Sequence, residues 1–260
     1  PVSGSTLSWG SEDLPDEFVD NVGDDIVDMA VSGDGSIIYV TVSSNETYRS
    51  SNGGESWTTA TVVDGTDVLA NVDFIAVAQD DPNYIAVVNA TDPVVFISDD
   101  AGANWDTLLA VGGLTAVTDL AISVEKGGNH FIAVIGYDST TVETWYYEIG
   151  AIGSVWTEAI NGSPATADLA GAVAFSPNFY SDQVMVNITA DTAGDTVDLN
   201  IFSFNTKTWN SGAFSDYPAS LEQDTPAAIN TLDAASIAMA PDYLGSDDDM
   251  RVLFYGLTVN

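Results

Sequence analysis

Carboxylates are the side chains of this sequence that are numerous enough to do chemistry. The 260 residues include 39 Asp and Glu but only four Lys and Arg, one His and no Cys, so the formal net charge is −35. Clustered carboxylate oxygens are the ligands that hard cations such as Ca²⁺ prefer. The sequence has two clusters of aspartates that could bind such a cation. Neither cluster has the spacing of an EF-hand loop, so acidic surface turns remain the alternative to calcium binding. The candidate calcium ligands are Asp191, Asp195 and Asp198, and Asp247, Asp248 and Asp249.

Catalysis has few candidate groups beyond these acids. Most glycoside hydrolases use two carboxyl groups at a set separation, one with a raised pKa, and a sequence shows neither property. His130 is the only histidine, and zinc structural sites or Cys–His and Ser–His–Asp centres need partners that are missing here. We interpret His130 as a polar residue that begins a strand. The sequence therefore predicts that the protein is not an enzyme, with paired-carboxylate carbohydrate chemistry as a lower-ranked alternative.

The charge also limits the partners. A net charge of −35 repels phosphate backbones, and anionic lipid surfaces are disfavoured for the same reason. No apolar run is long enough for a membrane-spanning helix. We expect self-association, or binding to other surface proteins and glycans, with Ca²⁺ as the candidate cofactor.

The sequence points to a secreted or cell-surface location. The first residue is Pro1 rather than Met, which fits a processed secreted protein or a fragment. Ser and Thr are abundant, and four Asn-x-Ser/Thr sequons are present, about the number expected by chance in such a chain. The candidate glycosylation sites are Asn45, Asn89, Asn161 and Asn187.

Regularly spaced tryptophans indicate the elements that position these residues. Trp57, Trp105, Trp156 and Trp209 follow one another at steps of 48, 51 and 53 residues, and Trp9 lies 48 residues before the first of them. A fixed period of about 50 residues is the signature of one supersecondary unit repeated along the chain.

Each complete repeat contains the same series of β-strand patterns. It opens on a short apolar strand centred on alanine, continues after a turn into a β-branched and aromatic run, and then has an aromatic third strand that leads to the Trp. Four antiparallel strands in about 50 residues form one propeller blade. The alanines that mark the first strands are Ala30, Ala76, Ala121, Ala174 and Ala238.

The turn before two of the tryptophans has a recognisable pattern. Ser98-x-Asp100-x-Gly102-x-x-Trp105 has a carboxylate that can accept backbone N–H groups and a glycine for an unusual backbone conformation. The preceding repeat has the same pattern with Asn for Asp, in Ser50, Asn52, Gly54 and Trp57. This pattern resembles the Asp-box, or BNR, repeat of sialidase-like and sortilin-like propellers. The third and fourth repeats keep only the aromatic strand and the Trp.

The resemblance implies an all-β propeller of four-stranded blades, with the indole rings wedged near the blade boundaries. It does not imply sialidase activity, because sialidases bind the sugar carboxylate with three arginines and this chain has only Arg49 and Arg251. We expect a single propeller domain, or part of a larger one, over residues 1–260. The predicted repeats are 25–62, 70–110, 116–160, 168–213 and 234–260, with an N-terminal strand at 5–10.

The last predicted repeat is incomplete, which leaves two interpretations. The chain is part of a longer propeller or repeat array, or a partner supplies a missing strand. The favoured function is a non-enzymatic structural or adhesive module of an extracellular assembly, such as a surface-layer or sheath protein. A glycan-binding or protein-binding propeller is the second hypothesis, and a halophilic origin would explain the acidity without any assembly.

Overall fold

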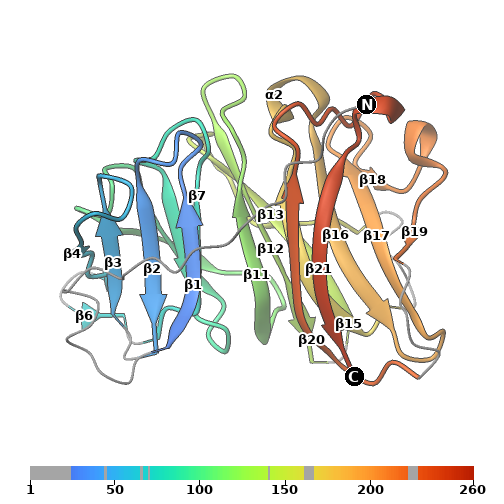
Figure 1. Ribbon diagram of the computed structural model, residues 1–260, viewed down its shortest axis with the longest axis horizontal. Helices are drawn as coiled ribbons and strands as arrows, with labels where there is room; N and C mark the ends of the chain where they lie inside the picture. The colour runs from blue at the N-terminus through green and yellow to red at the C-terminus, as the bar shows by residue number, and fades with distance from the viewer. Residues whose placement is uncertain are drawn as a thin grey trace, which may run out of the picture.

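The computed structural model describes residues 25–260, except residues 44–45, 65–66, 70, 140, 161–166 and 222–227. Antiparallel sheets follow one another from β1–β4 to β20–β21 (Figure 1). The predicted all-β propeller class is confirmed, with four sheets of four or more strands and an incomplete last repeat. No helix in the described part of the chain is long and apolar enough to cross a membrane.

Each of the four large sheets, called blades below, contains consecutive strands. Blade 1 contains β1 (Ile26–Val31), β2 (Ile38–Val42), β3 (Thr47–Ser50) and β4 (Thr58–Thr59). Blade 2 contains β7 (Phe74–Val77), β8 (Ile85–Val88), β9 (Val94–Ser98) and β10 (Asp106–Ala110). Blade 3 contains β11 (Ala116–Ile122), β12 (His130–Asp138), β13 (Thr141–Ile149) and β14 (Thr157–Glu158). Blade 4 contains β15 (Leu169–Phe175), β16 (Val184–Asp191), β17 (Thr196–Ser203), β18 (Thr208–Trp209) and β19 (Ala219–Ser220).

The remaining elements are short, apart from one hairpin near the end of the chain. β20 (Leu232–Met239) and β21 (Leu253–Val259) form a two-stranded sheet, called the C-terminal hairpin below. β5 (Val63–Asp64) and β6 (Asp67–Val68) form a small ribbon between blades 1 and 2. The short helices are α2 (Phe179–Asp182), η1 (Gly212–Phe214) and η2 (Asp248–Met250). The sequence predicts only a turn where α2 occurs, directly after Pro177 and Asn178.

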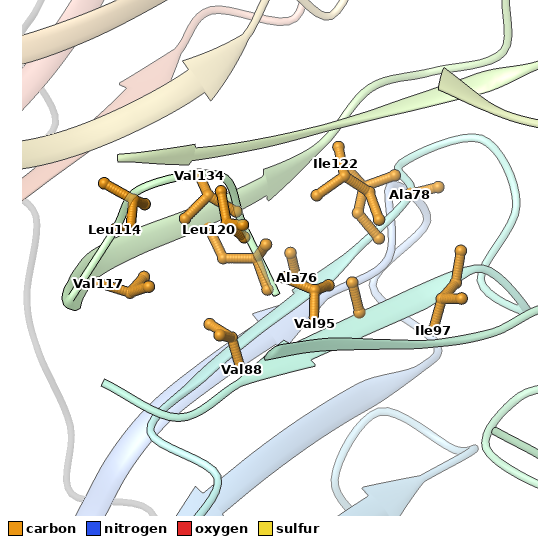
Figure 2. Packing of buried hydrophobic residues seen from close by; sticks show 13 residues of the cluster. Ala76, Ala78, Val88, Val95, Ile97, Leu114, Val117, Leu120, Ile122 and Val134 are labelled. Atoms are coloured by element: carbon orange, nitrogen blue, oxygen red, sulfur yellow. The ribbon is translucent and has the colours of Figure 1, made fainter. Parts of the chain in front are cut away.

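Apolar clusters between neighbouring sheets hold the blades together. Ala76 and Val88 from blade 2 share one buried cluster with Leu120 and Val134 from blade 3 (Figure 2). Comparable clusters join blades 1 and 2, blades 3 and 4, and blade 4 and the C-terminal hairpin. A single twisted sheet has two faces and cannot cover both, so each blade depends on its neighbours for burial.

Candidate functional site

The two predicted turns have matching hydrogen bonds. Ser98 Oγ accepts the N–H of Gly102 at 2.9 Å, and Asp100 Oδ1 accepts the N–H of Asn104 at 2.8 Å. Hydrogen bonds from Asn104 hold the pKa of Asp100 below its ordinary value. Gly102 has φ +85°, a conformation that glycine adopts most readily. The carboxylate therefore organises the turn that carries the Trp.

The blade 1 turn uses an amide in place of the carboxylate. Gly54 N–H donates to Ser50 Oγ at 2.8 Å, and Ser56 N–H donates to Asn52 Oδ1 at 2.9 Å. Asn52 supplies the same acceptor oxygen as Asp100 does in blade 2, without its charge. The Ser, the Asn or Asp and the Gly of each predicted turn therefore have contacts within that turn.

Two of the tryptophans connect their blade to the preceding one. The indole N–H of Trp156 donates to the carbonyl of Leu108 in blade 2 at 3.0 Å. The indole N–H of Trp209 donates to the carbonyl of Ala159, beside β14 of blade 3, at 2.6 Å. In each pair the acceptor lies three residues after the Trp of the preceding blade. The third and fourth repeats thus make this blade contact although they lack the turn motif.

Two aspartates on innermost strands make a second kind of contact between blades. Asp28 Oδ2 accepts the N–H of Ile75 in blade 2 at 2.8 Å, and Asp119 Oδ2 accepts the N–H of Val173 in blade 4 at 2.8 Å. The other oxygen of each carboxylate accepts the N–H of the next residue in its own strand. Each aspartate therefore bridges its own strand and the first strand of the following blade.

Both bridging carboxyls titrate abnormally. Burial raises the pKa of Asp119 to about 7, and the negative charge of Asp28 contributes to the shift, while the N–H donors oppose it. Burial likewise raises the pKa of Asp28.

The alternation of apolar and polar residues along the strands does not predict the contacts of Asp28 and Asp119 between blades. The only signal is that both aspartates immediately precede the apolar triplet of a first strand.

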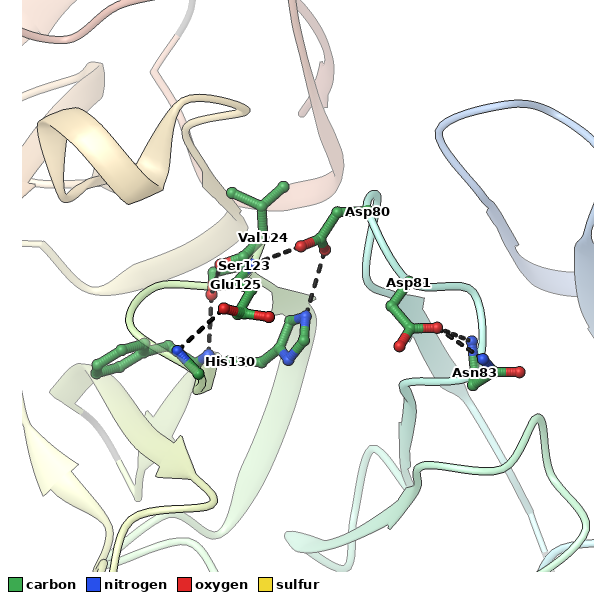
Figure 3. A network of polar contacts seen from close by, with 9 residues as sticks. Asp80, Asp81, Asn83, Ser123, Val124, Glu125 and His130 are labelled. Carbon is green, nitrogen blue, oxygen red and sulfur yellow. Dashed lines mark hydrogen bonds and ion pairs between the residues drawn. The ribbon is translucent and has the colours of Figure 1, made fainter.

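His130 lies at the boundary between blades 2 and 3 (Figure 3). Its Nε2 is 3.3 Å from Asp80 Oδ1, and its ring stacks on Tyr84 with the centroids 4.3 Å apart. Asp80 Oδ2 also accepts the N–H of Glu125 at 2.7 Å. His130 is the first residue of β12 and is buried. It contributes to the packing of two blades.

The first strand of blade 1 is exposed at the position that is buried in the following blades. Ile75, Leu120 and Val173 each face the preceding blade and are 4, 5 and 4% exposed. Met29 occupies the matching position of β1 and is 56% exposed, and Val27 beside it is also exposed. This face has no covering sheet among the described residues.

The C-terminal hairpin is exposed on its opposite face. One face packs on blade 4 through Leu253 and Leu257, whereas Phe254 points the other way and is 68% exposed. β21 pairs with β20 and with no other described strand. The described sheets thus form a series with a large exposed apolar side chain at each end.

The predicted calcium ligands do not converge. Asp191 Oδ1 accepts the N–H groups of Ala193 and Gly194 in its own turn, and Asp195 Oδ1 accepts that of Ile229. Among the residues that the structure describes, no three His, Asp or Glu side chains are grouped as a metal site.

The remaining predicted calcium ligands also have local contacts. Asp198 Oδ2 accepts a hydrogen bond from the hydroxyl of Thr196. Asp247 caps η2 by accepting the N–H of Asp249, and Asp248 pairs with Arg251. These contacts match the alternative of acidic turns. Calcium binding stays an untested prediction.

Two of the residues predicted as glycosylation sites are buried in the folded chain. Asn89 is 6% exposed and donates from Nδ2 to the carbonyl of Asn71. Asn187 is 1% exposed and donates to Thr144 across the boundary of blades 3 and 4. A glycan needs an exposed amide, so this burial disfavours the two sites, and glycosylation stays an untested prediction. Asn45, Asn161 and the predicted strand at 5–10 with Trp9 lie outside the described residues.

No protein-family model matches the chain, and no curated protein matches it in sequence. Solved structures with a similar fold include the GH74 xyloglucanase of Xanthomonas campestris, at 20% identity and TM-score 0.51, over 82% of this chain and 33% of that one. Hydrazine synthase of Kuenenia stuttgartiensis aligns at 13% identity and TM-score 0.54, over 92% and 57%. The β-propeller domain of Myceliophteria thermophila Cps50 (Swd1) aligns at 11% identity and TM-score 0.52, over 82% and 58%.

These similarities define the class of the protein as a β-propeller. The chain spans a third to less than two thirds of the length of the structures to which it is similar. At such identities the likeness shows the fold alone.

The prediction that the protein is not an enzyme is contradicted, because a glycoside hydrolase is among the structures that share the fold. The prediction relied on the missing Arg, His and Cys partners. Chemistry based on two carboxylates needs only Asp and Glu, in which the chain is rich.

Proposed function

We propose that the chain is a structural or adhesive module of an extracellular assembly, and that it associates with copies of itself or with other surface proteins through the ends of its open series of blades. The observation that carries the proposal is the exposure of Met29 at one end and of Phe254 at the other. Contiguous exposed apolar surface marks interaction sites on soluble proteins. Surface-layer and sheath proteins are the kinds of assembly that fit a chain that is acidic, rich in Ser and Thr, and free of Cys.

We also infer that the turns at Ser50–Trp57 and Ser98–Trp105 are Asp-boxes. Their support is the shared set of turn hydrogen bonds from Asn52 and Asp100. In this role they stabilise the blades, and the interaction surface lies elsewhere.

The test is the mass of the chain in solution as protein and salt concentrations rise. We expect association that grows with ionic strength, because salt screens the repulsion between molecules of charge −35. Light scattering gives the mass, and electron micrographs of the same samples distinguish a lattice or filament from a closed oligomer. A chain that stays monomeric at every salt concentration, and binds neither surface proteins nor glycans, would contradict the proposal.

Glycoside hydrolysis is a second candidate function, favoured by the carboxyls of Asp28 and Asp119. A general acid works best with a pKa near neutrality, and the pKa of Asp119 is raised to about 7. Xyloglucan is the first substrate to test, because one of the solved structures with a similar fold is a xyloglucanase. Release of reducing sugar that disappears in Asp119→Asn, while the variant keeps its fold, would establish this function. Equal release by both proteins would exclude Asp119 as the acid.

A further inference from the structure

We propose that Asn52 is a site of spontaneous deamidation, at which the folded chain converts the turn of blade 1 into a carboxylate turn like that of blade 2. Asn52 and Gly53 lie between β3 and β4, and both are exposed. The backbone nitrogen after an asparagine can attack the side-chain amide, and glycine hinders this attack least because it has no side chain. The other Asn-Gly pair, Asn161-Gly162, lies outside the described residues. This modification is independent of the proposed assembly function.

The reaction needs only water. The Gly53 nitrogen forms a bond to Cγ of Asn52 and gives up its proton, and the bond from Cγ to Nδ2 breaks to release ammonia. The product is a cyclic succinimide. Water then opens the ring by adding its hydroxyl to one carbonyl carbon and its proton to the ring nitrogen. Opening at Cγ leaves Asp at position 52, and opening at the backbone carbonyl leaves isoaspartate.

The turn holds the Asn52 amide in a way that favours the attack. Asn52 Oδ1 accepts the N–H of Ser56 at 2.9 Å and the hydroxyl of Ser50 at 2.9 Å. Negative charge develops on this oxygen as the nitrogen adds to Cγ, and donors already aimed at the oxygen stabilise that charge. The departing Nδ2 lies 3.0 Å from the Ser56 hydroxyl, which can pass on the proton that the Gly53 nitrogen loses.

One hydrogen bond opposes the attack. The Gly53 N–H donates to the carbonyl of Ser36 at 2.9 Å, so the nitrogen reaches Cγ only when this bond opens. The bond joins two turns at the surface, and local opening of such turns costs much less free energy than global unfolding. The rate of deamidation therefore depends on how often the turn of blade 1 separates from the turn that precedes β2.

Blade 2 shows that the same kind of turn accepts a carboxylate. Asp100 Oδ1 accepts the hydroxyl of Ser98 and the N–H of Asn104, the counterparts of the two donors to Asn52. Asp100 Oδ2 accepts the side-chain amide of Asn104 at 2.6 Å. At position 52 the second oxygen would face the Ser56 hydroxyl, which can rotate to donate to it. Asp is therefore a product that the turn can hold with charge-assisted hydrogen bonds.

Peptide mapping of aged wild-type protein tests the proposal. Cleavage after glutamate, at Glu46 and Glu55, isolates residues 47–55 with Asn52 among them. During incubation at neutral pH we expect this peptide to gain the mass difference between a hydroxyl and an amino group. The folded protein should gain negative charge on ion exchange over the same period. Asn83 and Asn104, which Tyr and Trp follow, should remain amides in the same samples.

Gly53→Ala is the matched control. Gly53 has φ +70°, and blade 2 already has Ala101 at the corresponding position with φ +61°. A Cβ on Gly53 meets only the carbonyl oxygen of Gly35, at 3.8 Å, so the variant should fold. Its methyl group hinders the attacking nitrogen, and we expect the rate at Asn52 to fall roughly tenfold.

Asn52→Asp represents the finished product. We expect its melting temperature to equal or exceed that of fresh wild-type protein, because the carboxylate keeps the Ser56 N–H and Ser50 hydroxyl as donors. Residues 47–55 of this variant should gain no mass during incubation. A lower melting temperature would overturn the claim that the turn holds the product.

Loss of the Asn52 amide in the folded wild-type chain, slowed in Gly53→Ala, supports the proposal. If the folded chain keeps this amide while the chain unfolded in urea loses it, the turn protects Asn52 and the proposal is overturned. Retention of the amide in both states overturns it as well. Equal rates in wild type and Gly53→Ala would indicate direct hydrolysis and overturn the attack by the Gly53 nitrogen. Light scattering measures self-association separately, so none of these outcomes decides the proposed function.

Discussion

Aspartates have opposite roles at different places in the blades. Asp100 accepts hydrogen bonds at an exposed turn, where they lower its pKa, whereas burial at the bridge between blades raises the pKa of Asp119. Ionisation of Asp100 therefore stabilises the folded chain, and ionisation of Asp119 opposes folding. The carboxyl groups behind the net charge of −35 are thus not all on the surface, since that of Asp119 is buried between blades.

The pH dependence of stability should report Asp119. Its folded pKa of about 7 exceeds its ordinary value of 3.8, so its contribution to stability is complete below pH 3.8 and is lost as the pH rises to about 7. The free energy of unfolding, measured with urea, should fall by up to about 1.4 kcal/mol per pH unit in that window. Asp119→Asn should reduce this slope, and Asp106→Asn, at an exposed site, should not. Equal slopes in all three proteins would contradict the assignment.

The turn before Trp105 offers a matched pair of variants. Asp100→Ala removes the acceptor of the Asn104 N–H, whereas Asp100→Asn keeps an oxygen in the arrangement that Asn52 already has in blade 1. We expect the alanine variant to melt a few degrees lower, and the asparagine variant to lose less at neutral pH, because it gives up the charge and the Oδ2 acceptor of the Asn104 amide but keeps the acceptor of the Asn104 N–H. Calorimetry measures both. Equal losses would show that the charge, not the acceptor, supports the turn.

At the scale of elements, burial of each innermost strand depends on the preceding sheet. Ile75 is 4% exposed with blade 1 before it, and Met29 is 56% exposed without a described sheet before it. The indole hydrogen bonds add a directional contact to this apolar packing. Radial packing therefore sets the neighbour and the orientation of each blade.

Replacement of Trp209 should show how much the indole hydrogen bond contributes to the free energy of unfolding. Trp209 is buried, and its N–H donates to Ala159. Trp209→Phe loses this hydrogen bond and leaves a carbonyl unpaired, so unfolding should require about 1–3 kcal/mol less. Trp209→Ala adds a cavity and should cost about 3–5 kcal/mol.

Trp105 provides the control, because its indole N–H has no hydrogen-bond partner among the described residues. Trp105→Phe should cost less than Trp209→Phe, because no hydrogen bond to a neighbouring blade is lost. Urea titration compares the two. A larger loss at Trp105 would show that ring volume, rather than the hydrogen bond, determines the cost.

At the scale of the whole molecule, apolar packing between blades acts against electrostatic repulsion. Four basic residues cannot neutralise 39 acids. The two arginines are used locally, Arg49 at the hydroxyl of Tyr39 and Arg251 at Asp248 and the ring of Phe214. The net repulsion therefore remains to be screened by the solvent.

Added salt should stabilise the fold. We expect the melting temperature to rise between about 10 mM and 1 M NaCl, because the screening length shrinks from about 30 Å to about 3 Å. A neutral osmolyte at the same osmolality is the control for effects unrelated to charge. Unfolding at low salt would also fit a halophilic origin, and a melting temperature independent of salt would contradict the role of repulsion.

The repeat, the strand patterns and the two turns could be predicted from the sequence alone, because these depend on local features such as the period of alternation, glycine at positive φ and a polar side chain that bonds its own turn. The tertiary structure, by contrast, shows that Asp28 and Asp119 bridge blades and that the side chains of Asn89 and Asn187 are buried. It also decided that Met29 and Phe254 lie uncovered. These outcomes depend on residues about 50 positions apart that meet only when one sheet packs on the next.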